Sequence, residues 1–198
     1  DKTVRVMKDS GGMRLLQAKD LGGFESHPMD FFDWVMAVAS YDPSAGWISG
    51  VVGVHPWQVS IMEPRLQQEI YGADPDTWIA SPYAPFGRAK RVEGGYLFST
   101  DVPYSTGTDH SEWVILGGMV TDDAGNVGTP PDVRHFVLRR GDYEIVEGSW
   151  NSWACRAPVA RTCERRRPSS PTIGCTPRRR CSTAPTRASS VRISRSTR

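Results

Sequence analysis

The first 152 residues of this 198-residue chain contain no cysteine, and all four cysteines lie in residues 153–198. That last part contains no lysine, leucine, phenylalanine, tyrosine, methionine or aspartate. Cysteines confined to such a low-complexity segment do not make a disulfide framework. The chain also lacks any apolar stretch near the roughly 20 residues of a membrane-spanning helix, and its first residues have no apolar signal-peptide core. We therefore expect no membrane contact and a cytoplasmic location.

The net charge of +2 conceals two oppositely charged parts. Residues 1–152 carry 12 basic and 21 acidic side chains, whereas residues 153–198 carry 12 arginines and one acid, Glu164. The near-neutral total is an average over these two parts and describes no real surface. Neither the net charge nor the isoelectric point near 8.4 therefore identifies a partner.

The arginine-rich residues 153–198 have two interpretations. As a protein segment they cannot bury a core, so they predict a disordered arm that binds nucleic-acid phosphates in a salt-dependent way. However, lysine would serve phosphate contact equally well as a point charge, and it is absent. GC-rich DNA read out of frame encodes this composition, and the neighbouring frame from Ser152 permits M-G-L-P-G-T-G-S-K-D-V. We favour a frameshift after Ser152, keep nucleic-acid binding as the alternative, and do not expect nucleic acid as a partner.

Hydrophobic spacing predicts helices first and strands afterwards. The expected helices are 1–9, a buried helix at 28–40, one that starts after Asp42-Pro43-Ser44 and runs through Val52 toward His55, and Pro64–Tyr71. The expected strands are 77–81, 87–92, 95–100, 112–121, 132–139 and 142–147. Helices followed by strands indicate segregated α and β regions, hence an α+β fold. There is no internal repeat, no G-x-G-x-x-G motif and no Walker loop to hold a nucleotide.

Four short motifs, in order, resemble one family. They are Leu21–Phe24 (L-G-G-F), Ser44–Trp57 (S-A-G-W through G-V-H-P-W), Ser81–Pro85 (S-P-Y-A-P) and Tyr104–His110 (Y-S-T-G-T-D-H) followed by Trp113. Together they resemble the oxygenase components of two-component, reduced-flavin-dependent aromatic hydroxylases, which have the acyl-CoA dehydrogenase fold. The permitted G-L-P-G-T-G-S also resembles a segment of this family, at the position where it should follow Trp150-Asn151.

The resemblance implies a particular division of the chain. Residues 1–75 would be a partial N-terminal helical domain, residues 76–152 an incomplete antiparallel, β-barrel-like middle domain, and residues 153–198 a disordered out-of-frame tail. The family's C-terminal four-helix domain has no counterpart here. One departure from the family pattern is Val102, which stands where the family usually has tryptophan.

The resemblance also implies a chemistry and the residues that carry it. The family hydroxylates a phenol ortho to its hydroxyl through a C4a-hydroperoxyflavin. His55 matches a family histidine beside flavin and substrate, and histidine suits this role because modest environmental changes move its pKa across neutrality. Ser81 matches a serine near the phenol, where its hydroxyl could donate to a developing phenolate. The structural alternatives are a helix-end histidine and an ordinary strand-end serine.

Further residues are implied at the cofactor and in the substrate pocket. Ser105, Thr106 and Gly107 match the turn at flavin N5, with a simple β-turn as the alternative. Trp57, Tyr83 and His110 are expected in the substrate pocket. Trp47, Trp57 and Trp113 could stack on a flavin or a steroid ring, or simply fill the core. No cluster of histidines or acids has ligand spacing, so we expect no metal site.

The implied cofactor is reduced flavin, FMNH2 or FADH2, with O2 as co-substrate. The implied partners are a separate flavin reductase, a small aromatic or steroid-derived phenol, and three further copies of the intact protein in a homotetramer. Lacking part of the family's length, this chain is expected to bind reduced flavin weakly or not at all and to be impaired. A related alternative on the same fold is an acyl-CoA dehydrogenase-type flavoenzyme.

Overall fold

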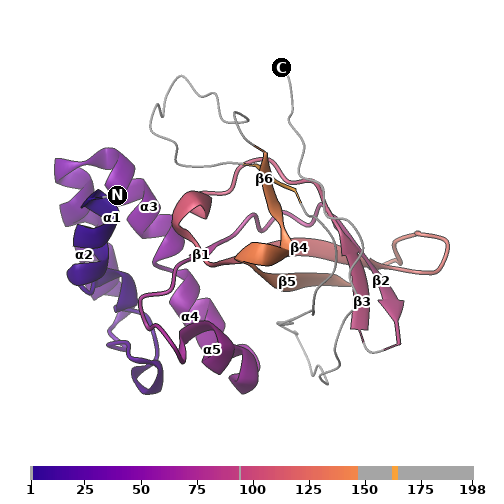
Figure 1. Cartoon of the computed structure of the whole chain (residues 1–198), viewed down its shortest axis with the longest axis horizontal. Helices are drawn as coiled ribbons and strands as arrows, with labels where there is room; N and C mark the ends of the chain where they lie inside the picture. Colours follow the sequence, from indigo (N-terminus) through magenta and orange to yellow (C-terminus); the bar gives the residue numbers. More distant parts are fainter. Residues whose placement is uncertain (1, 94, 147–161, 165–198) are drawn as a thin grey trace.

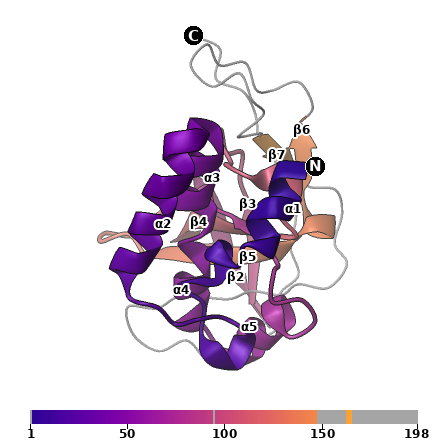
Figure 2. The same cartoon turned by 90° about the vertical axis from the view of Figure 1, so that its left-hand side faces the viewer.

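The computed structural model describes residues 2–93, 95–146 and 162–164 (Figure 1). A layer of helices stands beside a twisted sheet, and the turned view shows the helices in front of the strands (Figure 2). The helices are α1 (Lys2–Asp9), α2 (Pro28–Tyr41), α3 (Pro43–Val52), α4 (His55–Ser60) and α5 (Pro64–Tyr71). The strands are β1 (Ile79–Ala80), β2 (Gly87–Val92), β3 (Gly95–Ser99), β4 (Trp113–Thr121), β5 (Val133–Arg139), β6 (Glu144–Val146) and β7 (Thr162–Glu164).

Proline in the first turn begins each of the helices α2 to α5. The first turn has spare backbone N–H groups, so the missing N–H of proline is harmless there and its fixed φ suits the helix. Two carboxylates cap the next free N–H groups. Asp42 accepts from the backbone of Ser44 and Ala45, and Glu63 accepts from Leu66 at 3.2 Å.

The helix expected to run toward His55 is α3, and it stops before His55. It ends at Val52, and α4 begins anew at His55. Pro56 explains the break, because proline cannot continue a helix from within but starts one readily. Gly53 fills the corner, where a Cβ would lie 2.7 Å from the ring of Phe31. The consequence for function is that His55 stands at the first position of a new helix.

The prediction that α2 is buried was wrong. In the described part of the chain only Phe31 of this helix is fully buried, while Phe32 and Met36 expose 51% and 61% of their surfaces. One side of α2 packs on α3, where the methyl of Ala39 approaches Gly46 so closely that a Cβ there would lie 2.4 Å away. A helix with apolar residues on all sides is expected to be buried, but this pattern does not identify the element that covers each side.

The sheet is mixed, although an antiparallel one was expected. β4 pairs antiparallel with β5 along one edge. Its other edge pairs parallel with β1 through its first residues and parallel with β2 through its last four. β2 and β3 form the expected antiparallel hairpin. Strand direction depends on the path of the connections, which hydrophobic alternation does not record.

Both faces of this sheet are covered, which explains why nearly all of β4 is buried. On one face, Trp113 and Ile115 of β4 pack with Val59, Leu66 and Ile70 from α4 and α5. On the other face Val114 and Leu116 belong to a second cluster, which includes Phe98 and Phe136, stacked at 4.3 Å, and Val102. A third cluster joins α1, α3 and Trp78.

Three residues of the predicted disordered tail form a strand. β7 pairs antiparallel with β6, and Cys163 lies opposite Ile145. This pairing uses backbone groups that every residue except proline carries, so it needs no particular sequence. The rest of the tail lies outside the described residues. No helix in the described part of the chain combines the length and hydropathy needed to cross a membrane.

Candidate active site

The connection from β1 to β2 carries two of the predicted site residues, Ser81 and Tyr83. It runs along the edge of β4 between the two parallel partners, and the backbone N–H of Gly117 donates to the carbonyl of Pro82 at 3.1 Å. A Cβ on Gly117 would lie 2.1 Å from the carbonyl oxygen of Tyr83. Glycine at this position therefore lets the connection lie directly against the strand.

The structure brings His55, Ser81 and Tyr83 together. The Nε2 atom of His55 lies 2.7 Å from Ser81 Oγ, and its Nδ1 atom lies 2.8 Å from the hydroxyl of Tyr83. The His55 side chain is fully buried, at 0% exposure, whereas Ser81 is half-buried and Tyr83 exposes 39% of its surface. Among these three, Ser81 and Tyr83 are accessible from the surface, and His55 is buried in contact with both.

Two residues that the sequence did not indicate extend this group. The hydroxyl of Tyr83 donates a short hydrogen bond to Oε1 of Gln58, and Nε2 of Gln58 lies 2.9 Å from Nδ1 of His135. The ring of His135 also lies 5.2 Å from that of Tyr83. His135 is directly opposite Gly117 in the β4–β5 ladder. In the sequence, His135 was only a histidine on a predicted strand, and nothing there indicated its contact with Gln58.

Burial controls the protonation of this group. It lowers the pKa of His55 from 6.5 to about 3, so the imidazole is neutral at physiological pH. Burial also lowers the pKa of His135. Burial raises the pKa of Tyr83 to about 12. The group is therefore uncharged near neutrality and suited to hydrogen bonding with a neutral polar ligand.

The predicted flavin turn is built against α3. Gly107 has φ +74°, and a Cβ there would lie 2.7 Å from Val52, so both its conformation and its surroundings require glycine. Ser105 is buried and its hydroxyl accepts a hydrogen bond from Thr108. Thr106 is half-buried, and its Oγ1 accepts from Nε1 of Trp47 at 3.3 Å. Of the three predicted cofactor residues, only Thr106 is partly exposed.

The other two predicted pocket residues have different surroundings. Trp57, in α4, exposes 54% of its surface, so it is not part of the core. His110 lies edge-on to Trp78 with ring centroids 6.5 Å apart. Burial lowers the pKa of His110, and the neighbouring carboxylate of Asp109 opposes that shift. His110 thus faces the cluster of α1 and α3. Of the tryptophans considered for stacking, Trp113 is a core residue.

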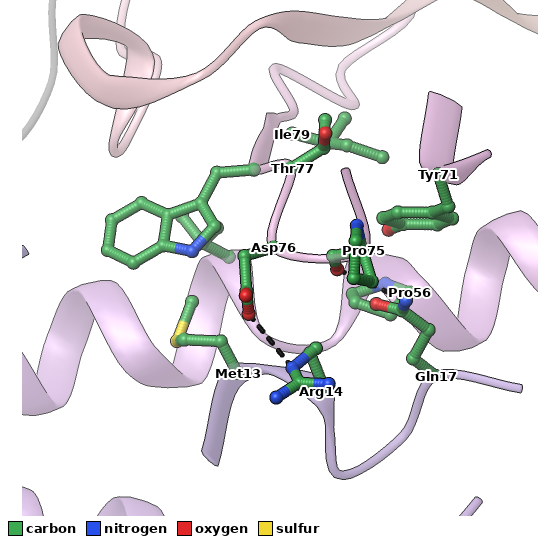
Figure 3. Close-up of a pocket in the computed structure, with 11 residues that line it drawn as sticks. Met13, Arg14, Gln17, Pro56, Tyr71, Pro75, Asp76, Thr77 and Ile79 are labelled. Carbon is green, nitrogen blue, oxygen red and sulfur yellow. Dashed lines mark hydrogen bonds and ion pairs between the residues drawn. The ribbon is translucent and has the colours of Figure 1, made fainter. Parts of the chain in front are cut away.

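A small cavity borders the first turn of α4 at Pro56 (Figure 3). Arg14 and Asp76 form an ion pair of 2.8 Å within it. Gln17 donates to the carbonyls of Leu21 and Pro75, which holds the L-G-G-F turn against the segment before β1. The cavity measures about 10 Å³, which is room for one water molecule. The L-G-G-F motif therefore has a structural role.

Known proteins are similar to this chain over part of their length. No protein-family model matches the chain. It is 50% identical over 156 residues to a pigment production hydroxylase of Rhodococcus erythropolis, covering 79% of this chain and 40% of that protein. It is 41% identical over 147 residues to the flavin-dependent monooxygenase oxygenase subunit HsaA of Mycobacterium tuberculosis, covering 74% and 36%. It is 33% identical over 158 residues to the p-hydroxyphenylacetate 3-hydroxylase oxygenase component of Acinetobacter baumannii, covering 79% and 36%.

Solved structures of similar proteins superpose on this chain. The HsaA monooxygenase of M. tuberculosis superposes with a TM-score of 0.77 at 35% identity, over 87% of this chain and 43% of that one. XiaF of Streptomyces, in complex with FADH2 and glycerol, superposes with a TM-score of 0.77 at 28% identity, over 87% and 42%. The chain is related to the oxygenase components of flavin-dependent monooxygenases.

Kinship with these flavin-dependent oxygenase components confirms the fold class expected from the four motifs. The chain has part of the acyl-CoA dehydrogenase-like fold, with helices and a sheet. It spans about 40% of the length of the curated relatives that it matches. Where that family usually has tryptophan, Val102 is fully buried in the second sheet cluster.

Proposed function

We propose that the chain is part of the oxygenase component of a two-component monooxygenase that hydroxylates a phenol ortho to its hydroxyl, using reduced flavin and O2. The observation that carries this proposal is that one segment, residues 43–60, positions both candidate groups. Trp47 and Val52 of α3 contact the turn of residues 105–107, which would hold the flavin. Helix α4 begins with His55, which contacts the Ser81 and Tyr83 side chains that would hold the phenol. The relatives include a hydroxylase named for a phenol, p-hydroxyphenylacetate.

The residues at the Thr106 turn fit a flavin. Oγ1 of Thr106 accepts a hydrogen bond from Trp47, so its own proton can be donated to a ring nitrogen. The indole of Trp47 exposes 59% of its surface beside this hydroxyl and provides an apolar plate for an aromatic ring. Reduced flavin bound here would supply the activated oxygen. Thr106 and Trp47 would orient the ring, and the backbone bend at Gly107 would hold them in place.

The Ser81 group would hold the phenol. Ser81 Oγ is within reach of the surface and hydrogen-bonded to a neutral, buried imidazole. A phenolic hydroxyl placed against Ser81 would therefore be oriented by a group that carries no charge. Trp57, two residues after His55, offers an exposed aromatic face for an apolar substrate such as a small aromatic or steroid-derived phenol. His55 would act through Ser81 as a positioning residue.

The partners are also part of the proposal. An oxygenase component that uses reduced flavin needs a separate reductase to supply it, and we propose such a partner, with the protein in the cytoplasm. We further propose that the intact protein is a homotetramer whose additional regions cover the exposed apolar side of α2. In the described part of the chain this side includes Met29, Phe32 and Met36.

Binding of 4-nitrophenol to the 198-residue chain tests the phenol site. We expect saturable binding in equilibrium dialysis, weakened about fivefold in Ser81→Ala because one hydrogen bond contributes on the order of 1 kcal/mol. Ser40→Ala, the same change at an exposed position of α2, is the control and should leave binding unchanged. Equal affinity of Ser81→Ala and wild type, or no saturable binding, would contradict the proposal.

A further inference from the structure

The chain of hydrogen bonds beyond His55 has a direction, and Gln58 determines it. A carboxamide oxygen only accepts and a carboxamide NH2 only donates. Oε1 of Gln58 accepts from the hydroxyl of Tyr83, and its Nε2 faces Nδ1 of His135 at 2.9 Å. The single proton of the Tyr83 hydroxyl is therefore committed to Gln58. Gln58 is itself buried in α4, so water does not compete for these contacts.

The tautomer of His55 follows from this direction. The oxygen of Tyr83 lies 2.8 Å from His55 Nδ1, and with its proton directed to Gln58 it can only accept. Nδ1 must then carry the imidazole proton. In a neutral imidazole the other nitrogen, Nε2, is an acceptor. Ser81, 2.7 Å from Nε2, therefore donates its proton inward to His55.

We propose that Gln58 and Tyr83 are positioning residues that hold His55 as the Nδ1–H tautomer, so that Ser81 meets the substrate as a hydrogen-bond acceptor. The site would thus bind the protonated phenol and accept its O–H. The sequence led us to expect the opposite, a Ser81 hydroxyl donating to a phenolate. This inference rests on the proposed function for the identity of the ligand, and on the contacts of Gln58 and Tyr83 for the tautomer.

Substitutions at Gln58 test the direction in which the hydrogen bonds from Gln58 to Ser81 run, as distinct from the existence of these contacts. Gln58→Glu keeps an acceptor for the hydroxyl of Tyr83, so His55 should stay protonated on Nδ1. Gln58→Leu removes that acceptor, which frees Tyr83 to donate to Nδ1 and moves the proton of His55 to Nε2. Tyr83→Phe removes one oxygen from a partly exposed side chain and should also move the proton to Nε2. Gln68→Leu, on the exposed side of α5, is the matched control.

The measurement is the two-bond ¹H–¹⁵N correlation spectrum of the imidazoles in the histidine-labelled 198-residue chain. The chain has four histidines, and the spectrum of His55→Gln identifies the signals of His55. We expect the Nδ1–H pattern in wild type, Gln58→Glu and Gln68→Leu, and the Nε2–H pattern in Gln58→Leu and Tyr83→Phe. An Nε2–H pattern in wild type, or an unchanged tautomer in both Gln58→Leu and Tyr83→Phe, would overturn the inference.

A second readout concerns the ligand and separates this inference from the proposed function. An accepting Ser81 should raise the apparent pKa of bound 4-nitrophenol in wild type, as measured by the absorbance of its phenolate. In Tyr83→Phe the hydrogen bonds should run in the opposite direction, so that Ser81 donates to the ligand. This variant should therefore lower the apparent pKa of bound 4-nitrophenol. A lowered pKa in wild type would overturn the inference. Absence of 4-nitrophenol binding would count against the proposed function. The spectrum of His55 would still determine the direction of the hydrogen bonds.

Discussion

His55 shows how one position can depend on two kinds of constraint at the residue scale. Pro56 makes it the first residue of a helix, and the contacts with Ser81 and Tyr83 occupy both its ring nitrogens. The motif around His55 could be recognised in the sequence. Its complete burial could not, because burial depends on chain segments that lie 26 or more residues further on.

The burial of His55 predicts a pH dependence of stability. The pKa of His55 is about 3 in the folded chain and near 6.5 in the unfolded chain. Between these two pH values the unfolded chain therefore binds a proton on His55 and the folded chain does not. The contribution is fully present above pH 6.5 and is lost as the pH falls toward 3. Over that window each pH unit should lower the free energy of unfolding by about 1.4 kcal/mol, and His135, whose pKa is also lowered, acts in the same direction.

Urea unfolding at pH 7, 6 and 5 measures this dependence. His55→Gln should reduce the slope of the free energy of unfolding against pH by up to about 1.4 kcal/mol per pH unit. Ser40→Ala, a change of a non-titrating side chain at an exposed position of α2, should leave that slope as in wild type. Identical slopes in His55→Gln and wild type would show that His55 is not the buried neutral group described above.

At the scale of elements, β4 supports the part of the site that the helices do not provide. Its edge holds the Ser81–Tyr83 connection, and its residue Gly117 lies opposite His135. In the sequence, Gly117-Gly118 could be assigned to a strand, but the reason for glycine there was not visible. That reason is the close approach of a backbone from another part of the chain.

Gly117→Ala tests the importance of this close approach. A methyl group 2.1 Å from the Tyr83 carbonyl cannot fit without moving backbone, so we expect a loss of about 3 kcal/mol in the free energy of unfolding. Gly141→Ala, at a position with nothing within 4 Å, should change it by less than about 0.5 kcal/mol. Denaturant melts of both variants make the comparison, and similar stabilities would refute the proposed packing.

At the scale of the whole molecule, the charge break after Ser152 remains the main feature of the sequence. The similarity to the pigment production hydroxylase spans 156 residues, close to the length of the acidic part. β7 does not conflict with an out-of-frame origin, because its pairing with β6 uses backbone groups. The frameshift stays a prediction.

Sequencing the gene around codon 152 tests this prediction. We expect that restoring one base opens a frame encoding G-L-P-G-T-G-S followed by more family-like sequence. If genomic and transcript sequences show that the arginine codons continue the frame of residues 1–152, without a family-like alternative, the segment is a genuine part of the protein. A salt-dependent affinity for DNA or RNA that disappears on deletion of residues 153–198 would then favour the nucleic-acid alternative.

Local chemistry determined much of this protein from the sequence alone. Hydrophobic alternation predicted strands 87–92 and 95–100 and the longer strands 112–121 and 132–139, and the structure places β2, β3, β4 and β5 within a residue of these bounds. Proline and glycine marked most helix ends, because their effects on φ and on backbone hydrogen bonding act within a few residues.

Tertiary structure alone decided the strand directions, the exposed side of α2 and the partners of His55. Gln58 and His135 are 77 residues apart, and Tyr83 lies between them along the chain. Their contact arises because α4 covers the sheet face on which His135 lies, and because Gly117 leaves room for Tyr83. Long-range packing brings such groups together, and the sequence carries no local pattern that records it.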